Sequence, residues 1–158
     1  MLRKILQKVK RVFKKPNEVL IPSPERMAQF EKRMAVGEKV LDMGTGSGIL
    51  SEMAYRKGAK EVVSADINPA AIEAAKKRVP AAKVILSDLF ENIEGKFDTV
   101  IFAAPWSAGE ITRPLHYALF DNGVTERFFH EVGQYLSPGA SIWFEYSDAF
   151  PEKYDQLD

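Results

Sequence analysis

The sequence contains no cysteine and only two histidines among its 158 residues. The lack of cysteine excludes disulfide bonds and catalysis by a thiolate. Because histidine is scarce as well, we expect no bound metal ion. No run of 18 apolar residues is present, so we expect no transmembrane helix. Nothing near the N-terminus has the apolar core and cleavage pattern of a signal peptide, which favours a cytoplasmic protein.

The composition suits one folded domain, because hydrophobic residues make up 46% of the chain. The net charge is zero, but seven of the 22 Lys and Arg residues lie within residues 1–15, which contain no Asp or Glu. Apolar residues repeat there with helical spacing, which predicts a basic amphipathic helix. This helix either contacts RNA phosphates or an anionic membrane, or packs on the domain with its lysines in water, as we favour. Residues 16–158 are expected to form the domain itself.

Apolar strand-like segments alternate with helical patterns along the rest of the chain. The expected strands are residues 39–43, 61–65, 83–87, 97–103 and 141–146. The expected helices are residues 24–35, 47–57, 69–78 and 124–136. This alternation predicts an α/β fold, with a doubly wound and mostly parallel sheet of strand order 3-2-1-4-5. A ligand of such a sheet lies over the carboxyl ends of the first, second and fourth strands.

The most informative segment is residues 40–48, Val-Leu-Asp-Met-Gly-Thr-Gly-Ser-Gly. An apolar strand ends there at Asp42, and three glycines follow at alternate positions. Glycine lets the backbone turn sharply and approach a ligand closely, and this is where α/β sheets receive nucleoside cofactors. A dinucleotide turn would need glycine where Ile49 stands. Asp42 would also repel a pyrophosphate, whereas it would attract a cation.

The pattern D-x-G-x-G-x-G, from Asp42 to Gly48, resembles motif I of the class I S-adenosylmethionine-dependent methyltransferases. This cofactor carries a sulfonium and an ammonium and no phosphate, so it suits the charge of Asp42. The resemblance implies a Rossmann-like methyltransferase fold that binds S-adenosylmethionine through Asp42, Gly44, Thr45 and Gly46. A glycine turn without a ligand is the alternative interpretation.

Two further acidic residues follow the second and third strands. Asp66 lies about 20 residues beyond the glycines, the separation found in nucleoside sites, and its carboxylate can accept hydrogen bonds from ribose hydroxyls. Ile67 is then placed to pack on the adenine face. We expect Asp88 to accept from the adenine amino group and Leu89 to cover the ring, because loops at the carboxyl ends of strands hold the sites of this architecture. An ordinary loop aspartate is the alternative for Asp88.

The end of the fourth strand defines a narrower resemblance. The segments that carry it are Ile101-Phe102-Ala103-Ala104-Pro105-Trp106 and residues 20–25, 87–90 and 118–123. Together they resemble the HemK-type glutamine methyltransferases and related RNA and DNA amino-methyltransferases. In that family the strand ends in Asn-Pro-Pro-Tyr, whose Asn and backbone carbonyl hold the target nitrogen while the aromatic ring stacks on it. Here Ala103, which also borders the expected cofactor site, replaces the Asn and lacks its amide oxygen. Ala104, Pro105 and Trp106 are expected to face the methyl acceptor.

These features predict methyl transfer from S-adenosylmethionine to a protein, RNA or small-molecule acceptor. The sulfonium is already a good leaving group, so the protein mainly supplies position and charge. His116 is a candidate base, while His130 is expected to be structural. Two alternatives stay open, a binding module that has lost its acceptor site and an NAD-type oxidoreductase. The family usually adds a C-terminal antiparallel hairpin, for which the sequence offers no pattern.

Overall fold

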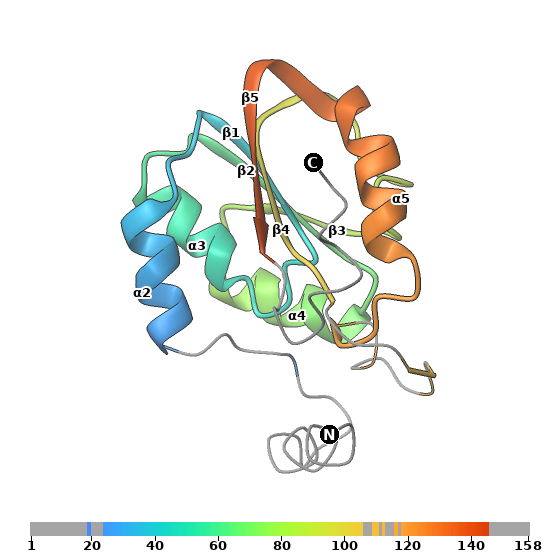
Figure 1. The fold of residues 1–158 in the computed structure, drawn as a ribbon. Helices are drawn as coiled ribbons and strands as arrows, with labels where there is room; N and C mark the ends of the chain where they lie inside the picture. The colour runs from blue at the N-terminus through green and yellow to red at the C-terminus, as the bar shows by residue number, and fades with distance from the viewer. Residues whose placement is uncertain are drawn as a thin grey trace.

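The computed structural model describes residues 19, 24–105, 109–110, 112, 116 and 118–145. Its α-helices are α2 (Pro24–Arg33), α3 (Ile49–Arg56), α4 (Pro69–Arg78) and α5 (Val124–Glu131), and a 3-10 turn, η2 (Val132–Tyr135), follows α5. Its strands are β1 (Lys39–Met43), β2 (Glu61–Asp66), β3 (Lys83–Leu86), β4 (Phe97–Ala103) and β5 (Leu136–Glu145). The strands and helices predicted from residue 24 onward are therefore present in the predicted order (Figure 1).

The five strands form one sheet in the order β3-β2-β1-β4-β5, as the sequence predicts. Every neighbouring pair is parallel. Because β1 lies in the middle, between β2 and β4, the order of the strands reverses beside it, and the carboxyl ends of β1, β2 and β4 meet at one edge of the sheet.

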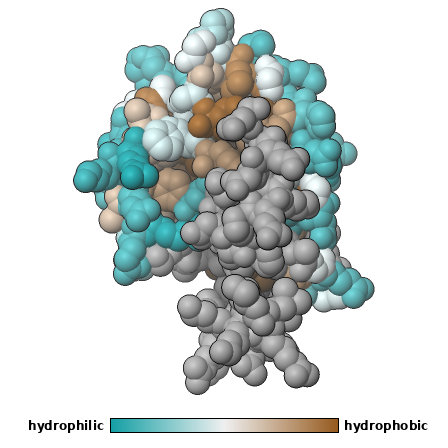
Figure 2. Space-filling model, viewed as in Figure 1, coloured by the Kyte–Doolittle hydropathy of each residue, from teal (hydrophilic) through white to brown (hydrophobic). Residues whose placement is uncertain are grey.

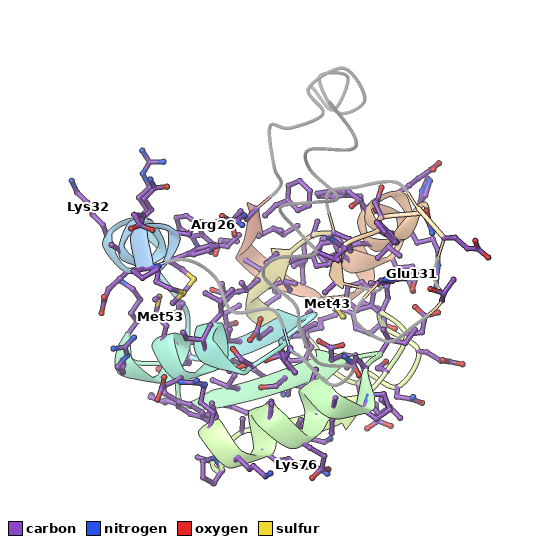
Figure 3. All side chains as sticks on the ribbon, turned by 90° about the horizontal axis from the view of Figure 1, so that it is seen from below. Arg26, Lys32, Met43, Met53, Lys76 and Glu131 are labelled. Carbon is purple, nitrogen blue, oxygen red and sulfur yellow. The ribbon has the colours of Figure 1, made fainter. Side chains whose placement is uncertain are left out.

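Helices cover both faces of the sheet, and each face has its own core. On one face Met53 of α3 packs with Phe30 and Met34 from α2 and the residue after it. On the other face Met43 of β1 packs with Phe128 of α5. Figure 3 shows Met53 beside α2 and Met43 beside α5. Successive residues of one strand point into different cores, as Val40 and Leu41 of β1 do, so the side chains of a strand end are divided between the two faces.

The fifth strand begins earlier than predicted. We expected a helix to residue 136 and a strand from residue 141, but α5 ends at Glu131 and β5 already begins at Leu136. The pairing with β4 is irregular: Phe97 pairs with Leu136, whereas Thr99 pairs with Ser141. The extra residues between these pairs include Pro138, which has no N–H to donate to a ladder, and Gly139 with φ of 76°. The turn residues of the sequence therefore form a bulge inside the strand.

Several predictions from the sequence fall outside the described residues. These are the basic helix of residues 1–15, the substrate-facing Trp106, and the segment after residue 145, where a C-terminal hairpin of the family would follow. In the part that the structure does describe, no helix is both long and apolar enough to cross a membrane. Figure 2 shows polar residues along the outer sides of α2 and α5, with apolar side chains gathered between these helices.

Candidate functional site

The glycine turn after β1 lies at the reversal of strand order, where open α/β sheets bind ligands. The backbone N–H groups of Gly44 and Thr45 both donate to the carbonyl oxygen of Ala65 at the end of β2, at 2.8 and 2.9 Å. Gly44 and Gly46 have φ values of 71° and 54°, in the left-handed region that strongly favours glycine. The turn is thereby held across the ends of β1 and β2.

The third glycine serves helix packing. Gly48 caps α3 with φ of 79°, and a Cβ at this position would lie 3.0 Å from the Cα of Ala75 in α4. Only a residue without a side chain lets α3 and α4 approach this closely behind the turn. The close approach therefore anchors the turn to α4 as well as to the sheet.

Asp42 is fully buried at the end of β1 and is surrounded by hydroxyl groups. Its Oδ2 accepts hydrogen bonds from Thr45 Oγ1 at 2.8 Å and from Ser51 Oγ at 2.6 Å. The hydroxyl of Ser51 also lies 2.6 Å from that of Ser64 on β2. The other carboxylate oxygen, Oδ1, is buried without a hydrogen-bond partner.

The environment of Asp42 disfavours its charge. Burial raises the pKa of this carboxyl from 3.8 to about 6, against the lowering effect of the hydrogen bonds from Ser51 and Thr45, and the charge of Asp66 raises it further. A buried carboxylate with an unpartnered oxygen is costly unless a cation or a donor comes near it. The site is therefore suited to a positively charged ligand.

Asp66, the last residue of β2, holds two loops with its two oxygens. Oδ2 accepts from the backbone N–H of Gly46 and Oδ1 from that of Asn68, both at 2.9 Å. Asn68 in turn caps α4 by accepting from Ala70 N. Burial raises the pKa of Asp66, while the backbone donors lower it. Each carboxylate oxygen has a second lone pair, so hydroxyl groups of a ligand still find acceptors here.

The residues predicted around adenine are arranged differently from one another. Ile67 is half-buried directly after β2. Asp88 is half-exposed and forms an ion pair with Arg127 of α5 at 3.2 Å. Leu89 has φ of 47° and is only 6% exposed, because it turns into the core on the α5 face. The structure thus brings Ile67 and Asp88 to the surface near the strand ends, whereas Leu89 lies beneath it.

On the acceptor side, Ala103 ends β4 in register with Glu145 at the end of β5. Ala104 N donates to the carbonyl oxygen of Glu145 at 2.9 Å, and Ala104 and Pro105 are both buried. The Glu145 carboxylate accepts from Arg26 Nε at 2.7 Å, which ties α2 to this end of the sheet. No sequence pattern indicates that Glu145 and Arg26 pair, because they lie 119 positions apart.

The two histidines have their own contacts. His116 Nδ1 accepts from Thr112 N at 3.2 Å, and its ring packs against Phe120. His130 is exposed and sits 3.8 Å from Glu126, one turn earlier in α5. Among the described residues, no group of three or more His, Asp or Glu side chains has the geometry of a metal site.

Of the hydroxyl groups around Asp42, the sequence predicts only Thr45 as a site residue and indicates neither Ser51 nor Ser64. The only available signal for Ser64 was its place two residues after Val62 and two before Asp66, on one face of β2. Ser51 had no signal, because small residues are common on the buried side of a helix. Their contacts depend on how α3 packs on the sheet, which no local sequence pattern indicates.

Comparison with known proteins places this geometry in context. A family model described as "Methyltransferase small domain" matches residues 27–153. A relative from Methanocaldococcus jannaschii named as a protein N5-glutamine methyltransferase is 34% identical over 150 residues, covering 86% of this chain and 76% of its own. The ribosomal protein L11 methyltransferase of Thermosipho africanus is 44% identical over 76 residues, covering 46% of this chain and 29% of its own.

Solved structures agree with the fold. The S-adenosylmethionine-dependent methyltransferase from Thiobacillus denitrificans, in complex with S-adenosyl-L-homocysteine, has a TM-score of 0.51 and 25% identity. The match covers 77% of this chain and 48% of that chain. This chain therefore spans about three quarters of the archaeal relative's length and less than half the length of the other two proteins.

Proposed function

Because the chain belongs to the methyltransferase small-domain family, we propose that it transfers a methyl group from S-adenosylmethionine to a protein acceptor or an RNA acceptor. The observation that carries this proposal is the glycine turn between the buried carboxylate of Asp42 and the half-buried carboxylate of Asp66. Negative charge beside a glycine turn suits a cationic nucleoside and opposes a pyrophosphate. The proposal therefore favours the methyl donor over a nicotinamide dinucleotide.

The described residues fit this cofactor. Asp42, Gly44, Thr45 and Gly46 would hold its methionine end, because they combine negative charge with close backbone approach. Asp66 would accept from the ribose hydroxyls with the lone pairs that its backbone donors leave unused. Ile67 would pack on the adenine. Asp88 would accept from the adenine amino group in competition with Arg127, with Leu89 packed beneath the ring.

When bound, S-adenosylmethionine supplies an activated methyl group that leaves a sulfonium without help from an acid or a base. The task of the chain is then to position the reactants and to match their charge. Ala103 would border the methyl group, and Ala104, Pro105 and Trp106 would face the acceptor. The backbone N–H of Ala104 is already used by Glu145, so a hydrogen-bond donor for the substrate would come from another residue.

The relatives guide the choice of acceptor. The Methanocaldococcus jannaschii protein is named for glutamine in a protein, and the Thermosipho africanus protein for a ribosomal protein. A protein acceptor is therefore our first proposal. The replacement of the family's Asn by Ala103 favours a second candidate, a module that binds the cofactor without transferring its methyl group.

Two measurements separate these candidates. Calorimetry with S-adenosylmethionine and S-adenosylhomocysteine tests the cofactor site, and labelled methyl transfer in a cell extract, followed by protease or ribonuclease digestion, tests transfer and the class of acceptor. Binding together with label that protease removes supports the protein methyltransferase. Binding without any label supports the module, and no binding of either ligand contradicts both.

A further inference from the structure

The hydroxyl groups around Asp42 form a directed chain, because each hydroxyl has a single hydrogen to donate. Ser51 donates its hydrogen to Asp42 Oδ2 and Thr45 does the same. The hydroxyl of Ser51 therefore acts as the acceptor in its 2.6 Å contact with Ser64, and Ser64 is the donor. The order is Ser64 to Ser51 to Asp42, with Thr45 joining from the turn.

This chain of donors favours the ionised form of Asp42, because Ser51 and Thr45 both donate to Oδ2. A proton on Oδ2 would compete with Ser51 and Thr45 for the same oxygen. A proton on Oδ1 would have no acceptor among the described residues, because Oδ1 is buried without a partner. Removing a hydrogen bond to a charged group is more costly than removing a neutral one, so the hydroxyl groups oppose the burial that disfavours the charge.

We propose that Ser51 and Ser64 are positioning residues of the cofactor site, which hold Asp42 as an oriented anion facing the cationic end of S-adenosylmethionine. Thr45, in the glycine turn itself, completes the set from the ligand side. This inference rests on the proposed function, but it concerns residues of α3 and β2 that lie behind the turn. It assigns them an electrostatic role in addition to their packing.

Other charged groups near these elements have partners elsewhere. On β2, Asp66 is the titratable group whose charge reaches Asp42, and it raises the pKa of that carboxyl. On α3, Glu52 pairs with Arg78 and Arg56 pairs with Glu31. The residue beside Asp42 on β4 is the apolar Ile101. The hydroxyl groups are therefore the nearby groups that lower the pKa of Asp42 against the effect of burial.

The test compares Ser51→Ala, Ser64→Ala and the double variant, with Thr125→Val as the matched control. Thr125 also has a buried hydroxyl, but that hydroxyl has no hydrogen-bond partner and belongs to α5 on the other face. Three ligands are measured by calorimetry: S-adenosylmethionine, S-adenosylhomocysteine and 5′-methylthioadenosine. The last ligand has the same nucleoside and a thioether but carries no positive charge.

Ser51→Ala is expected to weaken binding of S-adenosylmethionine and S-adenosylhomocysteine, which both carry an ammonium group, by about tenfold near neutral pH, which is the loss expected for a hydrogen bond to a charged group. Binding of 5′-methylthioadenosine should change by less than about twofold, because only the charge of Asp42 is affected. Ser64→Ala should have a smaller effect, of about threefold, since it acts through Ser51. The double variant should then bind no more weakly than Ser51→Ala, which is the non-additivity of one network.

A second measurement does not need a ligand. Carbon-13 NMR of the Asp42 carboxyl should show a higher pKa in Ser51→Ala than in the wild type, and Thr125→Val should leave it unchanged. Ser64→Ala gives the same comparison if Ser51→Ala does not fold. An unchanged pKa, or an equal loss of affinity for all three ligands, overturns the positioning role. Failure of the wild type to bind S-adenosylmethionine and S-adenosylhomocysteine would instead overturn the proposed function itself.

Discussion

Arg127 of α5 contacts both carboxylate oxygens of Asp88 through its Nη1 atom, at 3.2 Å each. The pair joins the loop after β3 to α5, 39 positions later in the sequence, and both side chains are partly exposed. An exposed pair of this kind contributes little to stability. The ion pair matters for ligand binding, because Arg127 competes for the carboxylate that is our candidate acceptor for the adenine amino group.

This competition predicts opposite effects for the two partners. Arg127→Ala should leave the affinity for S-adenosylhomocysteine unchanged or raise it by up to about threefold, because Asp88 then has no competing donor. Asp88→Ala should lower it by about fivefold to tenfold through the lost hydrogen bond. Calorimetry on both variants checks this, with Asp88→Asn as the control that keeps one acceptor oxygen. Equal losses in both single variants would contradict the adenine assignment and indicate a structural pair.

Asp66 is expected to contribute to cofactor affinity in two ways, through ribose hydroxyls and through the turn. Asp66→Ala should weaken S-adenosylhomocysteine binding by at least about tenfold, since a charge-assisted acceptor is lost. The variant also loses the bonds to Gly46 N and Asn68 N. Asp66→Asn is the better test, because its amide oxygen can keep one of them. Unchanged affinity in both variants would refute the ribose assignment.

The raised pKa of Asp42 predicts how stability depends on pH. Its pKa is about 6 in the folded chain against an ordinary value of 3.8, so the folded state binds this proton more tightly than the unfolded state. The contribution of Asp42 to stability therefore falls as the pH rises from about 4 to about 6, by about 3 kcal/mol in all, and is constant above that range. Asp42→Asn, which cannot ionise, should not show this decline.

Urea unfolding of the wild type and Asp42→Asn measures the effect directly. We expect the Asn variant to be more stable than the wild type by about 1–3 kcal/mol near pH 8, and the difference to vanish near pH 4. The same variant should lose most of its affinity for S-adenosylmethionine. A wild type whose stability rises between pH 4 and 6 by the same amount as that of the variant would show that Asp42 ionises normally.

Gly48 offers a prediction about packing behind the site. Gly48→Ala should destabilise the fold by about 2 kcal/mol or more, because a side chain is strained in the left-handed region and its Cβ would lie 3.0 Å from the Cα of Ala75. Gly123→Ala is the matched control, since Gly123 also precedes a helix with a left-handed φ of 84° but no atom lies within 4 Å of a Cβ there. Thermal unfolding of both variants compares the same substitution with and without the clash. Equal melting temperatures of the two variants would contradict the packing role of Gly48.

Ala103 tests the link to the glutamine-modifying relatives. Ala103→Asn restores the amide oxygen that the resemblance assigns to recognition of a planar nitrogen. Labelled methyl incorporation into glutamine-containing peptides should rise in this variant, while Ala103→Leu, which adds size without an acceptor atom, should not raise it. If neither variant methylates such peptides, the family's amide chemistry does not belong to this chain.

Much of the fold could be predicted because each signal was local. Val40 and Leu41 before the glycines, and Asn68 with Pro69 before a run of helix formers, specify a strand end and a helix start by themselves. The predicted start of β5 was wrong, because the true start depends on the pairing of Phe97 with Leu136 across a bulge, which no local pattern encodes. The burial of Leu89 was missed for a related reason, since its φ of 47° turns the side chain inward.

The candidate site also has residues that the sequence predicts and residues that it does not. Asp42, Gly44, Gly46 and Asp66 were predicted from spacing, and the structure brings them together at the ends of β1 and β2. Ser51 and Ser64 could not be predicted, because their contact with Asp42 depends on how α3 lies against two strands. Arg26 reaches Glu145 across 119 positions of sequence. Contacts between distant segments are where sequence patterns lose their information.

The all-parallel sheet has a consequence for how the chain reaches its native state. Parallel neighbours cannot be joined by a tight hairpin, so β1 meets β4 only after more than fifty intervening residues have been ordered or looped out. Long loops must close before such pairings contribute free energy, which slows folding. We therefore expect the site beside β1 to form late, and a newly synthesised chain to gain affinity for its methyl donor only once β4 has been added to the sheet.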